Sequence, residues 1–370
     1  MTVNSEYKRV AFIQSKRLTT VTNFDLENIW HRKIPGYGDV FCANWKGDRL
    51  FVPCDRRYFY LCGPTEEDST EFTMQKSIGR TYFFTWADSA KEIVFLFSPG
   101  GCHRVDLVKS KLETYQQHDL ACCGVDINPM GTLVAAGDLS GLVKLWPAKS
   151  SEETTGDPFG TFALPGSVRS TRWRSDKQLL VGLMDGTVWV LELDKEPLKI
   201  FTMESTVTCL SFGKHKQDEP PSILAASDTA STLEVWTIDG DNYTRQCSLK
   251  GHGTEEIWST AWSLDNRYLA TGSEDRTIHI YDMMDMSKPI LVETLKGMTA
   301  AVTCLDWKMT SLGSTLAASS DDRTVHVWTN EGSTFTLHHK FQTLHRHLMI
   351  TYCVLTDTDC LVCVTMSGQM

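Results

Sequence analysis

Large apolar residues return along this chain at a nearly constant interval, and no other feature of the sequence limits the possible folds as strongly. Short runs of alternating apolar residues end on a bulky side chain every 39 to 50 residues, at Trp45, Trp86, Ile127, Trp173, Phe212, Trp262 and Trp307. A second series keeps the same phase and recurs every 39 to 47 residues, at Leu61, Leu107, Trp146, Leu191, Trp236, Tyr281 and Trp328. A period of about 20 to 50 residues indicates a repeat architecture. The chain is therefore predicted to consist of stacked copies of one small unit.

Each period has the pattern of four short strands. Val, Ile, Thr, Leu and aromatic residues alternate with polar ones at period two, and Gly, Asp, Asn and Ser separate the runs, which is typical of antiparallel strands joined by tight turns. The sixth period shows all four runs, at residues 257–262, 268–272, 277–282 and 290–295. One such sheet cannot bury both of its faces, whereas seven or eight sheets packed around a common axis can.

The two ends of the chain decide the number of units. Residues 40–341 hold seven repeats, and residues 348–370 add two strand-like runs, which make half of a further unit. Residues 1–35 contain three more runs that could supply the missing strands. We expect both termini to close this last unit together, which gives eight units in a single domain spanning residues 1–370. Seven units is the alternative count.

Charge and cysteine content limit the partners and the compartment. The 36 basic residues against 46 acidic ones give a net charge of −10, the wrong sign for a protein bound to phosphate backbones over its whole surface, which argues against direct nucleic-acid binding. The 12 cysteines are scattered singly, as expected for reduced thiols. No apolar run reaches the roughly 18 to 20 residues of a membrane helix, and the N-terminus lacks the apolar stretch of a secretory signal. These features predict a cytoplasmic or nuclear protein with no membrane insertion.

The sequence offers no constellation of catalytic residues. The spacings typical of nucleotide-binding loops, zinc proteases, serine hydrolases and EF-hands are missing. The one CxxC motif, from Cys360 to Cys363, lies in a strand-like run, where residues three apart point to opposite faces. His345 and His347 have no further ligand at a metal spacing. We therefore expect no enzyme activity, no bound metal and no cofactor.

One stretch of the chain resembles a known family. Residues 251–282 begin with Gly-His and end with Tyr-Asp, with Trp262 between them, and they are similar to a WD40 repeat. Residues 316–328 match a second time, and the resemblance extends over about 40–337 and is strongest from Val207 onward. It implies a WD40-type β-propeller of seven or eight four-stranded antiparallel blades, with one blade closed by both termini.

In that family a buried hydrogen-bond network ties each blade together. The resemblance assigns this network to His252, Thr271, Asp275 and Tyr281, where tyrosine stands in place of the usual tryptophan. The following repeat keeps Asp322 and Trp328 but has Met298 and Ala318 at the positions of the histidine and the hydroxyl residue. Most blades are therefore expected to depend on packing more than on this network.

The resemblance also implies a function, that of a non-catalytic adaptor which holds other protein subunits in one complex. In the family's geometry, two sets of loops share one face, and on that face we expect a basic group of residues, here called the arginine sector: Arg56, Arg57, Tyr58, Arg80, Tyr82, His103, Arg104 and Arg169. Later repeats place acidic residues on the same face: Glu255, Glu256, Glu274, Asp321 and Asp322.

We expect the arginine sector to bind an acidic or phosphorylated segment of a partner, because arginine pairs with carboxylate and phosphate through two parallel hydrogen bonds. Alternatively, these residues are ordinary solvated turn residues. The alternative function is that of a reader, which binds a phosphorylated or methylated peptide at the propeller's central opening.

Overall fold

The structure is a computed structural model of residues 1–370. It describes the strands along the whole chain, and between residues 122 and 342 it also describes the connecting segments except 148–157, 216–218, 311–312 and 333. Before residue 122, the described residues outside strands are Glu67, Ser69, His118 and Leu120, and after residue 342 the description covers strands alone. Within these described residues there is no helix, and hence none long and apolar enough to span a bilayer.

The first three sheets are each built from four consecutive strands. The first contains β1 (Thr2–Asn4), β2 (Arg9–Ile13), β3 (Leu18–Thr22) and β4 (Asn28–Lys33). The second contains β5 (Asn44–Lys46), β6 (Arg49–Cys54), β7 (Tyr58–Cys62) and β8 (Thr70–Thr73). The third contains β9 (Phe83–Trp86), β10 (Ile93–Ser98), β11 (Gly101–Asp106) and β12 (Lys111–Thr114).

Five further sheets repeat this topology, and a final pair of strands follows them. The fourth sheet contains β13 (Cys122–Ile127), β14 (Leu133–Asp138), β15 (Leu142–Pro147) and β16 (Gly160–Ala163). The fifth contains β17 (Val168–Trp173), β18 (Leu179–Leu183), β19 (Thr187–Leu191) and β20 (Leu198–Thr202). The sixth contains β21 (Val207–Phe212), β22 (Ile223–Asp228), β23 (Thr232–Asp239) and β24 (Asn242–Lys250). The seventh contains β25 (Ile257–Trp262), β26 (Tyr268–Ser273), β27 (Ile278–Asp282) and β28 (Ile290–Leu295). The eighth contains β29 (Val302–Thr310), β30 (Gly313–Ser320), β31 (Thr324–Glu331) and β32 (Thr334–Gln342), and the final pair is β33 (Leu348–Leu355) with β34 (Leu361–Ser367).

All these sheets are antiparallel, so the predicted all-β chain of four-stranded antiparallel units is confirmed. In unit 2 the second strands are buried along nearly their whole length, and in β18 every residue is buried. The fourth strands are mostly exposed, and β24 carries polar residues at most of its positions. This gradient follows from packing, because a strand covered on both faces needs a continuous apolar run and an edge strand does not.

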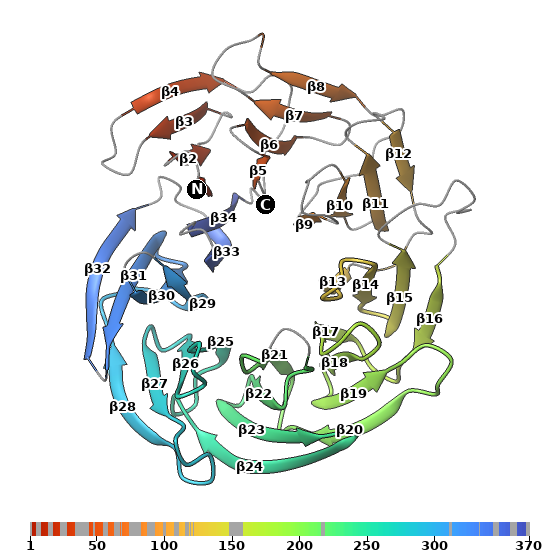
Figure 1. The fold of residues 1–370 in the computed structure, drawn as a ribbon, viewed down its shortest axis with the longest axis vertical. Helices are drawn as coiled ribbons and strands as arrows, with labels where there is room; N and C mark the ends of the chain where they lie inside the picture. Colours follow the sequence, from red (N-terminus) through yellow and green to blue (C-terminus); the bar gives the residue numbers. More distant parts are fainter. Residues whose placement is uncertain are drawn as a thin grey trace. The chain divides into compact units, whose positions relative to one another are not determined.

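The chain forms two compact units. Unit 1 comprises Met1–Phe83, Arg276–Ile278 and Leu295–Met370, and unit 2 comprises Phe84–Asp275 and His279–Thr294. In unit 2 the first strands of successive sheets lie beside one another, β13 next to β17, β17 next to β21 and β21 next to β25 (Figure 1). The predicted single domain stays a prediction.

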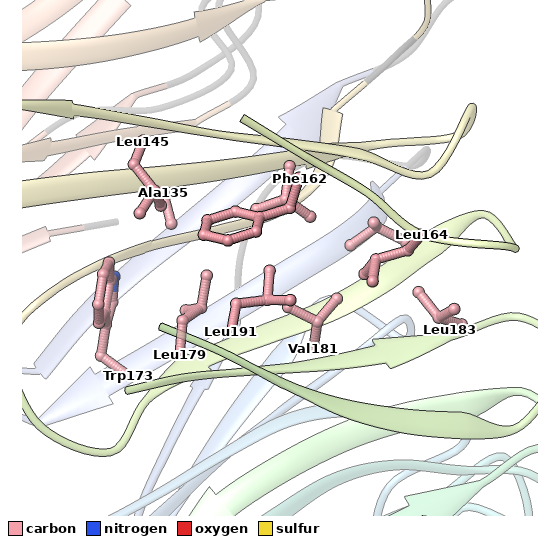
Figure 2. Close-up of a cluster of buried hydrophobic side chains, with 11 residues drawn as sticks. Ala135, Leu145, Phe162, Leu164, Trp173, Leu179, Val181, Leu183 and Leu191 are labelled. Atoms are coloured by element: carbon pink, nitrogen blue, oxygen red, sulfur yellow. The ribbon is translucent and has the colours of Figure 1, made fainter. Parts of the chain in front are cut away.

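The core of unit 2 lies between neighbouring sheets. Figure 2 shows one such cluster, in which Phe162 of the fourth sheet and Leu164, which directly follows that sheet, face Leu179, Val181 and Leu183 of the fifth. Trp173, at the end of β17, closes one side of the cluster and is 5% exposed. The bulky residues that recur in the sequence therefore pack between sheets, as their period indicates.

Close approach of the sheets requires a small residue at one position of the second strand. A Cβ atom on Gly182 of β18 would lie 2.5 Å from Val207 Cγ1, in the first strand of the next sheet. On Gly137 of β14, a Cβ atom would lie 2.6 Å from Val168 Cγ1. Real Cβ contacts are longer, so these glycines let adjacent sheets meet.

The turn between the second and third strands has a common construction. Asp228 accepts hydrogen bonds from the amides of Ala230 at 3.0 Å and Thr232 at 2.8 Å. One residue of the turn then has a left-handed backbone, with φ of 64° at Ser231 and 85° at Gly186 in the preceding sheet. Short polar side chains and glycine are the residues that favour such turns.

Unit 1 contains both ends of the chain. The strand β1 lies beside β34 and β5, and β33 lies beside β29. The described ladders join β1, β2, β3 and β4 in one sheet and β33 with β34 in another. The predicted blade shared by both termini, and with it the choice between seven and eight blades, therefore stays a prediction.

Candidate interaction site

The structure describes the side chain of one member of the arginine sector, Arg169. Arg56, Arg57, Arg80 and Tyr82 lie outside the described residues. Tyr58 is the first residue of β7, and His103 and Arg104 lie inside β11.

The position of His103 and Arg104 corrects the expectation that they belong to a loop. Ser98 at the end of β10 is paired with Gly101 at the start of β11, so the connection is only two residues long. His103 pairs with Leu96, and Arg104 pairs with Phe95. A two-residue hairpin extends the ladder into residues that a longer loop would have held.

Arg169 belongs to a series of residues at one position of the first strands. In β17 the pairing with β18 shifts between Val168 and Ser170, which leaves Arg169 as an extra, unpaired residue. The same bulge occurs in the first strands of four other sheets and leaves out Cys123, Thr208, Trp258 and, in unit 1, Thr303. A bulge redirects the side chain of its extra residue.

Two members of this series meet across the inside of unit 2. The guanidinium carbon of Arg169 lies 5.8 Å from the centre of the Trp258 ring, within the range of a cation–π contact. Both side chains are half-buried. Arg169 belongs to the fifth sheet and Trp258 to the seventh. The side chains of these two bulged residues therefore meet although a whole sheet separates them in the chain.

Carboxylates gather around this pair. Burial raises the pKa of Glu256, and the nearby Glu274 and Glu255 raise it further, whereas Arg169 lowers it. The amide of Glu274 donates to the carbonyl oxygen of Glu256 at 3.0 Å, which joins the two loops that carry these residues. Burial also raises the pKa of the Cys123 thiol, with Arg169 acting in the opposite direction.

The residues assigned to the network of the seventh sheet lie close together. His252 Nδ1 is 2.8 Å from Asp275 Oδ2, and His252 Nε2 is 2.8 Å from Thr271 Oγ1. Burial lowers the pKa of His252 from 6.5, although Asp275 opposes this. Tyr281 is also buried, and burial raises its pKa to about 12. These contacts hold one loop, one strand and one turn in place.

Sequence reasoning did not single out His279 as a further member of this cluster. Its ring stacks on that of His252 with centroids 3.8 Å apart and an angle of 19° between the planes, and its Nδ1 lies 3.3 Å from the Tyr281 hydroxyl. The sequence contained one indication of this role. His279 stands two residues before Tyr281, and His326 stands at the equivalent position in the next repeat, two residues before Trp328.

His252, Asp275 and His279 offer three potential metal ligands within 4.8 Å of one another. An imidazole binds a metal in the plane of its ring at about 2.0 to 2.1 Å. The two rings are stacked and nearly parallel, so no single ion can lie in both planes at that distance. The cluster is thus arranged for hydrogen bonding and stacking rather than for a shared ion.

The eighth sheet has a different arrangement. Asp322 accepts hydrogen bonds from the Thr299 amide at 2.6 Å and from the Thr324 hydroxyl at 2.6 Å. Trp328 is buried, with its ring 5.4 Å from that of His326. Met298, which occupies the place of the histidine, is buried as well. With no histidine at that place, the Asp322 carboxylate binds the neighbouring loop directly.

The sequence analysis also missed a buried pair formed by a residue before the fourth sheet and a residue of its second strand. His118 Nδ1 lies 2.7 Å from Asp138 Oδ2, and both side chains are fully buried. The His118 ring meets the Trp146 ring edge-on, with centroids 5.7 Å apart. The order His, Asp, Trp along the repeat could have indicated this pair.

The comparison with protein families agrees with this construction. The model of the WD domain, G-beta repeat, matches residues 109–147, 243–282 and 290–329. A chain of a solved structure described as the mitotic checkpoint complex has a TM-score of 0.58 at 16% identity, over 75% of this chain and 84% of that one. The chain folds as a WD40-type β-propeller, a class that generally provides non-catalytic scaffolds for protein interactions. The chain thus contains three segments that match the repeat of the WD40 family.

Curated relatives include proteins with different printed roles. Eukaryotic translation initiation factor 3 subunit I of Pyricularia oryzae is 26% identical over 48% of this chain and 53% of the relative. The DDB1- and CUL4-associated factor 11 homolog of Caenorhabditis elegans is 24% identical over 66% of this chain and 42% of the relative. The WDS homolog of Arabidopsis thaliana is 23% identical over 41% of this chain and 28% of the relative. The chain thus spans about half the length of these relatives or less.

Proposed function

We propose that this protein is a non-catalytic adaptor subunit that holds other proteins together in one complex. The observation that carries the proposal is the repeated sheet itself, matched three times by the WD-repeat model. Rigid sheets joined by exposed loops offer several surfaces without the need for a catalytic site. Relatives named as a subunit of an initiation factor and as a factor associated with DDB1 and CUL4 support the same reading.

The proposed compartment is the cytoplasm or the nucleus. Cys122, Cys209 and Cys247 carry free thiols, and burial raises the pKa of Cys122 to about 12 and also raises that of Cys247. A raised pKa makes a thiol poorly reactive, and free thiols are typical of reducing compartments.

The arginine sector remains the proposed contact for an acidic or phosphorylated partner segment. Its test is charge reversal at three arginines together, Arg57→Glu, Arg80→Glu and Arg104→Glu. The matched control reverses three exposed lysines of unit 2, Lys177→Glu, Lys199→Glu and Lys288→Glu. Both variants change the net charge equally, so a loss of partners in the first alone identifies the sector.

Affinity purification of the tagged protein followed by mass spectrometry tests the adaptor function. We expect one or more protein subunits in a constant ratio to the bait, retained at about 0.3 M salt, where weak surface contacts are screened. A bait that elutes alone would contradict the adaptor function. Binding of a short phosphorylated or methylated peptide, without any stoichiometric subunit, would favour the alternative function of a reader.

A further inference from the structure

Trp258 presents an aromatic face that already holds a cation. The Arg169 guanidinium lies 5.8 Å from the ring centre, and nothing in the sequence pattern of the fifth repeat requires an arginine there, because Cys123 and Thr208 fill the same position of the neighbouring sheets. Aromatic faces attract cations through the ring quadrupole. The site is therefore built around a positive charge.

The charge around Trp258 is unbalanced. Glu255 and Glu274 both raise the pKa of Glu256, and the guanidinium of Arg169 lowers it. Glu255 and Glu274 are exposed, and Glu256 is partly buried. The raised pKa of Glu256 shows that Arg169 does not fully compensate the burial and repulsion of that carboxylate. An additional cation brought to this place would relieve both effects.

We propose that Trp258, with Glu255, Glu256 and Glu274 around it, is a docking surface for a basic segment of a partner protein, whose lysine or arginine takes the place of Arg169 on the indole face. The inference rests on the proposed adaptor function and specifies the chemistry of one partner. Charge complementarity selects the occupant, because three carboxylates and an aromatic face disfavour an acidic segment and favour a cationic one. In the free protein Arg169 is the resident cation on the indole face, and the cation of the partner displaces it on binding.

The test measures binding of a fluorescein-labelled peptide, Gly-Gly-Lys-Arg-Lys-Gly-Gly, to the full-length chain by fluorescence anisotropy at about 0.15 M salt. A peptide with glutamate in place of the three basic residues is the charge control. We expect saturable binding of the basic peptide alone. The triple variant Glu255→Gln, Glu256→Gln and Glu274→Gln should weaken it about tenfold, and Trp258→Leu by a similar factor.

A matched variant separates the site from general charge. Glu196→Gln, Glu219→Gln and Glu293→Gln remove the same charge from exposed positions elsewhere, and they should change the affinity less than about twofold. Arg169→Ala should bind the basic peptide more tightly, by about threefold or more, because the resident cation is gone. Circular dichroism and melting temperature confirm that each variant is folded.

Three results would overturn the inference: equal losses in the two triple variants, weaker binding by Arg169→Ala, or no saturation below about 1 mM peptide. Tighter binding of the acidic peptide would also overturn it, and would show that Arg169 binds an acidic segment together with the rest of the arginine sector. None of these outcomes contradicts the adaptor function if protein subunits still co-purify in a constant ratio. Failure of the docking surface can therefore be distinguished from failure of the adaptor function.

Discussion

Arg174 joins two neighbouring sheets, and its replacement by methionine tests how these sheets are held together. The residue follows β17 and is 6% exposed. Its Nε donates to the carbonyl oxygen of Pro221 at 3.1 Å, and its Nη1 donates to the carbonyl oxygen of Gly240 at 2.9 Å. Nη1 also donates to Gln178 Oε1 at 2.7 Å. Pro221 precedes β22 and Gly240 follows β23, so one guanidinium ties the fifth sheet to the sixth.

The expected loss of stability follows from these contacts. Methionine keeps much of the apolar stem but donates no hydrogen bond. Pro221 is buried, and a carbonyl oxygen that loses its donor there costs about 1 to 3 kcal/mol. Gly240 is exposed, so water replaces its donor at little cost. The loss of the remaining contacts adds about 1 kcal/mol, and removing a buried charge offsets part of the total cost. The free energy of unfolding should therefore fall by about 2 to 4 kcal/mol.

Urea unfolding, followed by tryptophan fluorescence and by circular dichroism, measures this change. For a slope of about 3 kcal/mol per M, the midpoint should fall by roughly 1 M with the slope unchanged. Arg267→Met is the matched control, because Arg267 is exposed and its pair with Asp282 is 3.3 Å long. Its expected cost is about 0 to 1 kcal/mol.

The conservative variant Arg174→Lys refines the comparison. Lysine keeps the positive charge but not the planar geometry that reaches Pro221 and Gly240 together, so its midpoint should lie between those of the wild type and Arg174→Met. The reasoning is refuted if Arg174→Met and Arg267→Met lower the midpoint equally. It is also refuted if lysine restores full stability, since charge alone would then suffice.

Two further predictions concern packing and pH. Gly182→Ala should lower the free energy of unfolding by about 1 to 3 kcal/mol, because the added Cβ would lie 2.5 Å from Val207 Cγ1. A urea midpoint equal to that of the wild type would contradict this, since it would mean that the two sheets move apart at no cost. Burial and the nearby Lys340 lower the pKa of His326 from 6.5. At a pH between 6.5 and the lower pKa of His326 in the folded protein, the unfolded chain therefore binds a proton that the folded chain does not. Stability should therefore fall as the pH drops below 6.5, and His326→Leu should reduce that fall in melting temperature. Neither ring nitrogen of His326 has a hydrogen-bond partner among the described residues, so His326→Leu should change the melting temperature little at pH 7.5. If the variant lost as much stability at low pH as the wild type, the loss would not come from His326.

Local sequence patterns predicted the strands well. For the seventh sheet, residues 268–272 and 277–282 were expected as strands, and the structure has Tyr268–Ser273 and Ile278–Asp282. Alternation and turn chemistry act between residues that are close in the chain, which is why they can be read without tertiary contacts. The expectation failed for His103 and Arg104, where a short hairpin placed both residues within a strand.

The candidate site was predictable only in part. The sequence resemblance assigned His252, Thr271 and Asp275 to one network, and the structure places their side chains within hydrogen-bond distance. It did not assign His279, because a polar residue in the third strand has no fixed role from one repeat to the next. The equivalent positions hold Lys144, Trp189 and Glu234 in other sheets.

The sequence by itself determined the repeat, the strands and the turns, because each depends on spacing within about 45 residues and on the period-two alternation of apolar side chains. Tertiary structure alone decided which residues of different repeats meet. Arg174 reaches Gly240 across 66 positions, and Arg169 covers Trp258 from two sheets away. Such contacts depend on how sheets pack and on where a bulge turns a side chain, and neither is encoded in the composition of a single repeat.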